Sequence, residues 1–267
     1  MVYHVQFPGL GLDLTINRVA LAIGGFNIYW YGVIIAAGML LAMLYAFRNA
    51  VDYGIDSDRL VDVVAIGTVM AIVCARIYYV AMAPFAYQSL WEMIDIRKGG
   101  IAIYGAVIGA FVFGGLAAKW RKVPLLPLFD LVSLGFLIGQ GIGRWGNFVN
   151  QEAYGYAVTD PALCHFPISV FIEADGRWHL ATFFYESAWC FLIVAFILLM
   201  ERKGKLRRPG DAFLWYLFLY GVERAVVEGL RTDSLMLGPV RVSQLLAALL
   251  AAGSLIALIV RARRKNA

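Results

Sequence analysis

A polar cluster closes a long apolar stretch near the middle of the chain. It contains Arg144, Asn147, Asn150 and Glu152 and ends at Gly155. Polar groups at membrane depth are costly and tend to be functional. The planar guanidinium group of arginine matches phosphate and binds it in a bidentate manner. The cluster therefore predicts a phosphate site at the end of a membrane helix.

A second polar group lies closer to the C-terminus. Tyr220, Arg224, Glu228 and Arg231 are spaced at i, i+4, i+8 and i+11, which predicts one helical face. Arg224 and Glu228 form an i,i+4 pair whose charges can neutralise each other. Because burying an arginine in a membrane helix costs about 2.5–3.5 kcal/mol, we interpret Arg144 and Arg224 as functional.

Glycines and tyrosines form a third group. Gly99 and Gly100 precede an apolar run, and Tyr104 lies one turn inside it. Glycines in membrane helices more often allow close packing than chemistry. Tyr31, near the start of the first apolar run, fits the aromatic side chains that line membrane interfaces.

Other polar residues favour structural roles. For Arg76, a structural ion pair with Asp62 or Asp130 is open beside a functional role. His165 and His179 are expected on the surface of a long loop. None of these side chains predicts a site by itself.

Several classes of chemistry have no motif in the chain. We find no serine–histidine–acid set and no phosphate-cradling glycine loop, which argues against a lipase and an ATP-using enzyme. Cysteines and histidines show no metal-ligand spacing, so neither a metal nor a cofactor is expected. A phosphate site without its own nucleophile suits a lipid transferase whose acceptor is another molecule.

The composition indicates an all-α, polytopic integral membrane protein. Hydrophobic residues make up 61% of the 267 residues, charged residues only 15%, and the mean hydropathy is +0.73. Unbroken apolar runs exclude a β-barrel. We predict one membrane domain over residues 1–267, preceded at Val19–Phe26 by an amphipathic segment in the membrane interface. Seven spans are expected at about 26–47, 59–82, 100–119, 126–148, 181–200, 211–230 and 242–260.

The distribution of basic residues predicts the orientation of these spans. One side receives fourteen Lys and Arg residues, in the segments 48–59, 119–122, 202–208 and 261–265. The other side receives six, namely Arg18, Arg97, Lys98, Arg177, Arg231 and Arg241. The excess assigns the first side to the cytoplasm. The N-terminus and the 149–180 loop are then outside, the C-terminus is cytoplasmic, and the net charge of +5 reflects topology rather than nucleic-acid binding.

The pattern at 143–155 resembles the signature of the prolipoprotein diacylglyceryl transferases. The resemblance extends over nearly the whole chain, through motifs at 29–32, 75–80, 99–105, 185–187, 220–231 and 243–244. It implies a seven-span protein of the bacterial cytoplasmic (inner) membrane with its active site toward the extracytoplasmic side. It also implies transfer of the diacylglyceryl group from phosphatidylglycerol to the lipobox cysteine of a prolipoprotein signal peptide, with release of glycerol phosphate. This is the first step of lipoprotein maturation, a protein lipidation.

The resemblance also implies roles for the polar residues. Arg144 and Arg224 correspond to essential arginines and are assigned to the lipid phosphate and the leaving group. Tyr31 and Tyr220 are expected to hydrogen-bond the lipid or the thiol. Glu228 is expected to orient Arg224. The remaining expected substrate-binding residues are Asn147, Asn150, Glu152, Gly155, Arg231, Gly99 and Gly100.

One departure from the family pattern concerns proton transfer. Tyr104 stands where some family members carry a histidine proposed as the base. A tyrosine phenol, with a reference pKa of about 10, is a poor base at neutral pH. The identity of the base therefore stays open. A competing hypothesis is a transporter or binder of an anionic lipid or another anionic substrate, but the repeated halves that would favour a transporter are not evident in the sequence.

Overall fold

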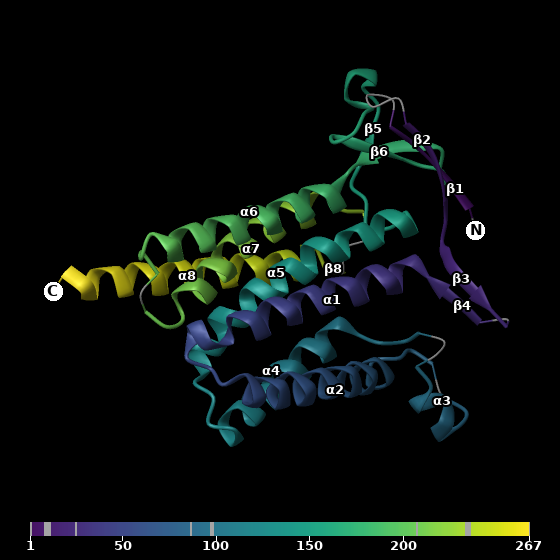
Figure 1. Cartoon of the computed structure of the whole chain (residues 1–267). Helices are drawn as coiled ribbons and strands as arrows, with labels where there is room; N and C mark the ends of the chain where they lie inside the picture. The colour runs from purple at the N-terminus through teal and green to yellow at the C-terminus, as the bar shows by residue number, and fades with distance from the viewer. Residues whose placement is uncertain are drawn as a thin grey trace. The chain divides into compact units, whose positions relative to one another are not determined.

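The computed structural model describes residues 2–7, 12–24, 26–85, 87–96, 99–206, 208–232 and 236–266 (Figure 1). Arg97, Lys98 and Arg207 of the charge count lie outside these residues. The chain divides into two compact units, one formed by Met1–Ala46 with Val132–Ala267 and the other by Phe47–Leu131.

Long helices occupy all the predicted spans. Six helices in the described part of the chain are long and apolar enough to cross a membrane, as expected for a polytopic membrane protein. The helix over the sixth predicted span, α7, is as long but carries Glu223, Arg224 and Glu228. The seven long helices are α1 (Trp30–Asn49), α2 (Ser57–Ala81), α4 (Ile103–Trp120), α5 (Leu125–Asn150), α6 (Thr182–Arg202), α7 (Asp211–Leu230) and α8 (Val242–Asn266).

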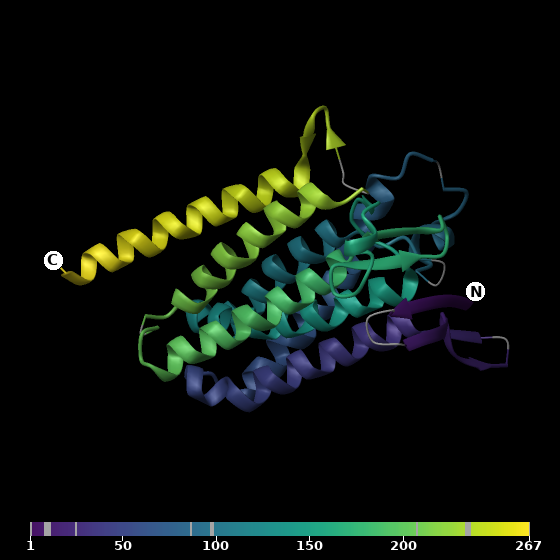
Figure 2. The ribbon, with the colours of Figure 1, turned by 90° about the horizontal axis from the view of Figure 1, so that it is seen from above.

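In the first unit, α6, α7 and α8 lie side by side (Figures 1 and 2). Small residues allow this approach: a Cβ added at Gly221 of α7 would lie 2.8 Å from the carbonyl oxygen of Ala247 in α8. The buried core joins α5, α6 and α7 through Leu134, Leu137, Cys190, Ile193, Ile197, Ala212 and Tyr216. These helices hold the polar residues of the site.

Strands add to the expected all-α architecture in the first unit. At the N-terminus, β1 (Val2–Phe7) pairs with β2 (Leu12–Asn17), and β3 (Val19–Ile23) pairs with β4 (Phe26–Tyr29). The predicted interfacial segment at 19–26 thus contains β3 and the first residue of β4, which belong to a hairpin that leads into α1. Its β-branched residues Val19 and Ile23 favour a strand, and Gly24 adopts the positive φ of a turn. A further short hairpin, β8 (Met236–Leu237) with β9 (Val240–Arg241), precedes α8.

The predicted 149–180 loop is a folded element. It contains β5 (Ala157–Val158), a short helix η3 (Pro161–Leu163), β6 (Ser169–Ile172) and β7 (Arg177–Leu180), with β7 central in the sheet. The expectation that His179 is a surface residue is wrong, because its side chain is 5% exposed. Its Nδ1 lies 2.8 Å from the carbonyl oxygen of Gly155, and its Nε2 lies 2.8 Å from Asp175 Oδ2.

In the second unit, α2 and α4 pack closely. A Cβ at Gly109 of α4 would lie 2.6 Å from the carbonyl oxygen of Met70, and one at Gly105 would lie 2.9 Å from Ala75 Cα. The interpretation of these glycines as packing positions is therefore supported. The unit also contains two short helices, η2 (Ala50–Tyr53) and α3 (Leu90–Ile94).

Arg76 organises a loop of the second unit. Asp62 pairs instead with Arg121, at 2.7 Å, so the predicted Arg76–Asp62 pair is wrong. The Arg76 guanidinium donates to the backbone carbonyls of Glu92, Met93, Gly99 and Gly100 over 2.7–3.1 Å. These bonds tie the end of α3 and the two glycines to α2.

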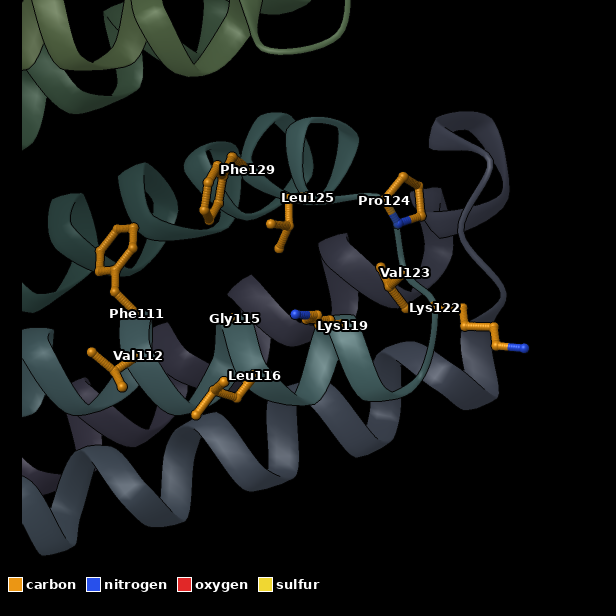
Figure 3. A pocket seen from close by; sticks show the side chains of 10 residues that line it. All are labelled: Phe111, Val112, Gly115, Leu116, Lys119, Lys122, Val123, Pro124, Leu125 and Phe129. Atoms are coloured by element: carbon orange, nitrogen blue, oxygen red, sulfur yellow. The ribbon is translucent and has the colours of Figure 1, made fainter.

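An apolar groove runs between α4 and the start of α5 in the second unit (Figure 3). Phe111 and Leu116 line it from α4, and Leu125 and Phe129 line it from α5. Lys122 extends away from the groove in the same view. An apolar surface of this kind suits contact with lipid chains.

Candidate functional site

The centre of the site is Glu186, on the first turns of α6. Its carboxylate is 1% exposed. Oε2 lies 2.5 Å from Arg144 Nη2 of α5 and 3.0 Å from Arg224 Nη1 of α7. Oε1 lies 3.8 Å from Arg231 Nη1. One buried carboxylate thus brings together three arginines that are distant in the sequence.

Glu228 provides a second carboxylate. Its Oε2 lies 2.6 Å from Arg224 Nη2, which confirms the predicted i,i+4 pair. Arg224 is therefore held by Glu186 on one nitrogen and by Glu228 on the other. A guanidinium paired with two carboxylates in this way has a fixed orientation.

Arg231 departs from the predicted helical face. The helix ends at Leu230, and Arg231 continues in an extended conformation that forms a β-bridge with Gly155. Arg241 of β9 ties this end of α7 to Tyr156. It donates to the carbonyls of Glu228 and Arg231 and, at 2.8 Å, to the hydroxyl of Tyr156.

Asn147, Asn150 and Glu152 lie together at the end of α5, as expected. Glu152 Oε1 accepts from Asn147 Nδ2 at 3.1 Å and from Asn150 Nδ2 at 3.3 Å. Gln151 and Ala153 adopt positive φ angles of 50° and 56°, which turn the chain sharply after the helix. The turn brings the Glu152 carboxylate back over the last turn of α5.

Gly155 is closely packed between Leu180 of the 149–180 element and Leu230 at the end of α7. Its N–H donates to the carbonyl of Leu180 at 3.0 Å, and the N–H of Tyr156 donates to that of Leu230 at 3.0 Å. A Cβ at position 155 would lie 2.8 Å from Leu180 Cβ and 3.1 Å from the oxygen of Leu230. These contacts explain why the position requires glycine. Its expected role in substrate binding stays a prediction.

Two predicted tyrosines border the arginines. Tyr31 packs its ring against Gly146 of α5 and interacts electrostatically with Glu152 and Arg144. Tyr220 stacks on Tyr216, with ring centroids 5.7 Å apart, and interacts with Arg144 and Arg224. Both phenols are therefore placed to meet a ligand of the arginines.

Two side chains near the arginines, Gln140 and Glu223, have buried acceptor oxygens without a hydrogen-bond donor among the described residues. Gln140 donates to Tyr216 at 3.4 Å, while its own carbonyl oxygen is buried without a hydrogen-bond donor among the described residues. Glu223 of α7 is 7% exposed, and in the same part of the chain neither of its carboxylate oxygens has a hydrogen-bond partner. Glu223 interacts electrostatically with Glu186, Arg144 and Arg224.

Glu186 and Glu223 were not among the predicted site residues. Glu186 belongs to the 185–187 motif, and a carboxylate inside an apolar span was the signal that could have identified it. Glu223 stands directly before Arg224 and off the face marked by Tyr220 and Glu228, so helical spacing did not reveal it.

The remaining predicted residues belong to the second unit. Tyr104 lies in the first turn of α4, with its ring centroid 6.4 Å from that of Tyr78. Gly99 and Gly100 adopt φ angles of 86° and 79°, and their carbonyls bind Arg76. The roles expected of these residues toward a substrate stay predictions.

The arrangement suits a phosphate ester. Arg144, Arg224 and Arg231 converge from different elements, and their carboxylate partners hold the guanidinium groups in place. Preorganised donors of this kind stabilise charge that develops on a departing phosphate. Among the described residues, no group of three or more His, Cys, Asp or Glu side chains could hold a metal ion.

Comparisons with known proteins agree with this chemistry. Residues 18–260 match the sequence model of the prolipoprotein diacylglyceryl transferase family. A phosphatidylglycerol–prolipoprotein diacylglyceryl transferase of Bacillus cytotoxicus is 43% identical over 263 residues, which is 97% of each chain. The proteins of the same name from Bacillus cereus strain Q1 and Bacillus anthracis strain A0248 are each 45% identical over the same share of both chains.

Proposed function

The chain belongs to the prolipoprotein diacylglyceryl transferase family, and we propose that it transfers the diacylglyceryl group of phosphatidylglycerol to a prolipoprotein cysteine. The acceptor is the thiol of the lipobox cysteine, and glycerol phosphate is released. The observation that carries this proposal is the set of arginines held by Glu186. Family membership supports a transferase over a transporter of anionic lipid.

The arginines serve the leaving group. Arg144 and Arg224 bind the phosphodiester of the lipid, and Arg231 adds a third positive charge. The thiolate attacks the terminal glycerol carbon, a C–S bond forms, and the C–O bond to phosphate breaks. The electron pair of that bond leaves with the phosphate oxygen, where the guanidinium groups stabilise the new charge.

The polar residues around the arginines position the substrates. Asn147, Asn150 and Glu152 form a linked set at the end of α5 that suits the hydroxyl groups of the lipid headgroup. Tyr31 and Tyr220 hydrogen-bond the lipid or the thiol. The roles of Tyr104, Gly99 and Gly100 toward a substrate are proposed from the family pattern alone.

The protein crosses the bacterial inner membrane seven times, with α7 as the additional span. The charged residues of α7 cost less than their number suggests, because Arg224 is paired with both Glu186 and Glu228. The excess of basic residues in the 202–208 and 261–265 segments supports a cytoplasmic C-terminus. In the first unit, the N-terminal hairpin and the end of α8 lie at opposite ends of the helices, which supports termini on opposite sides (Figure 2).

A reconstituted assay tests the activity. We expect purified protein, phosphatidylglycerol and a lipobox peptide to yield a peptide heavier by one diacylglyceryl group, together with free glycerol phosphate. A matched peptide with serine in place of the cysteine should remain unmodified. Absence of product with active family controls would overturn the proposed function.

A further inference from the structure

Glu223 is a buried carboxylate that the roles above do not use. Its side chain is 7% exposed, and neither oxygen has a hydrogen-bond partner in the described part of the chain. Burying a charged group without a donor is costly. By contrast, Glu186 and Glu228 contact the arginines directly. Glu223 therefore suits a donor that arrives with a substrate.

The order of residues along α5 and α7 indicates which substrate group donates a hydrogen bond to Glu223. On α5, Gln140 lies one turn before Arg144, and on α7, Tyr216 and Glu223 precede Arg224. Both helices end near the 149–180 element, on the side where the proposed orientation places the lipid headgroup (Figure 1). Along their helices, Gln140 and Glu223 thus lie on the side of Arg144 and Arg224 that is farther from the 149–180 element.

This position favours the thiol over the lipid as the natural donor. Moving from the phosphate toward the acyl chains, a diacyl phospholipid presents only the glycerol carbons and ester oxygens, which donate no hydrogen bond. In a displacement at the terminal glycerol carbon, the nucleophile approaches opposite the departing phosphate. The S–H group of the acceptor cysteine is therefore the donor that reaches this side of the arginines.

We propose that Glu223 accepts the proton of the acceptor thiol and is a catalytic residue of the transfer. The S–H proton moves to a Glu223 oxygen, the sulfur attacks the glycerol carbon, and the C–O bond breaks with its electron pair on the phosphate oxygen. The proton then passes from Glu223 to the phosphate or to water. This inference rests on the proposed function, and it supplies the base that Tyr104 is poorly suited to be.

The experiment compares a thiol with an acceptor that needs no base. Wild type and Glu223→Gln are assayed with a lipobox cysteine peptide and with the same peptide carrying selenocysteine, both kept reduced. A selenol is far more acidic than a thiol and is ionised at neutral pH. General-base catalysis typically contributes 100-fold or more. With the thiol peptide, we expect Glu223→Gln to lose at least about 100-fold in kcat. With the selenol peptide, its kcat should lie within about 10-fold of the wild-type value.

Controls separate this role from a structural one. Glu201→Gln makes the same change at the far end of α6 and should leave both rates unchanged. The KM for phosphatidylglycerol should change little in Glu223→Gln, because the arginines remain paired. A Glu223→Gln protein with a wild-type thiol rate would overturn the inference, as would equal losses with thiol and selenol. If wild type modified neither peptide, the proposed function itself would fail.

Discussion

At the scale of single residues, the site depends on how guanidinium groups are held rather than on charge alone. Arg224 has one nitrogen on Glu186 and another on Glu228. Lysine keeps the charge, but its single nitrogen has no planar fork, so it cannot offer separate nitrogens in fixed directions to the two carboxylates and a phosphate. For the rate of transfer, the planar geometry of the Arg224 guanidinium is therefore expected to matter more than its positive charge.

Arg224→Lys tests this point. We expect the rate of transfer to fall at least ~100-fold, the usual cost of removing one preorganised donor from a developing anion. Arg263→Lys, in the exposed tail, is the matched control and should retain activity. Steady-state rates with a lipobox peptide provide the measurement, and a fully active Arg224→Lys protein would refute the bidentate role.

Glu186 makes a separate prediction, about stability as well as rate. Its carboxylate neutralises buried arginines from α5 and α7, and removing one partner of a buried ion pair costs about 3–5 kcal/mol. We expect Glu186→Gln to lower the melting temperature in detergent and to abolish most activity. Glu201→Gln serves again as the control. Unchanged melting would show that the arginines are balanced by other groups.

At the scale of elements, the helices were predictable and the strands were not. Apolar runs of about twenty residues predict helices because the bilayer core demands that length. The β3–β4 hairpin was not predicted because a short apolar run before the first span does not distinguish a strand from an interfacial segment. The folded 149–180 element depends on long-range contacts, such as His179 with Gly155, that local spacing does not contain.

The same distinction applies to the site. Asn147, Asn150 and Glu152 are close in sequence, so one helix end brings them together as predicted. Glu186 could be noticed in the sequence as a carboxylate inside an apolar span, but its pairing with Arg144 and Arg224 depends on the packing of α6 beside α5 and α7. Arg231 does not lie on the expected helical face, because α7 ends at Leu230, one residue before it.

The close packing at Gly155 predicts the effect of a substitution between the 149–180 element and α7. An added Cβ would meet Leu180 and the Leu230 carbonyl, so Gly155→Ala should displace the loop from the end of α7. We expect a large loss of activity and faster proteolysis of the 157–180 segment. Gly115→Ala is the matched control, since a Cβ there meets nothing within 4 Å. Normal activity in Gly155→Ala would contradict the close packing.

At the scale of the whole molecule, the proposed orientation places the 149–180 element outside and the C-terminus in the cytoplasm. Ala174 lies at an exposed turn of that element, and Ala262 lies near the end of α8. In a background free of the native cysteines, we expect Ala174→Cys to react with an impermeant maleimide in intact spheroplasts. Ala262→Cys should react only after permeabilisation, and the reverse pattern would invert the topology.

The balance of charges around Glu186 has a consequence for what the protein retains. Three guanidinium groups, of Arg144, Arg224 and Arg231, share the site with the carboxylates of Glu186, Glu223 and Glu228. A site with equal numbers of both charges attracts free anions weakly, so the acyl chains must anchor the phosphate there. Transfer removes that anchor from glycerol phosphate, which should then diffuse away and inhibit the reaction only weakly when added to the assay.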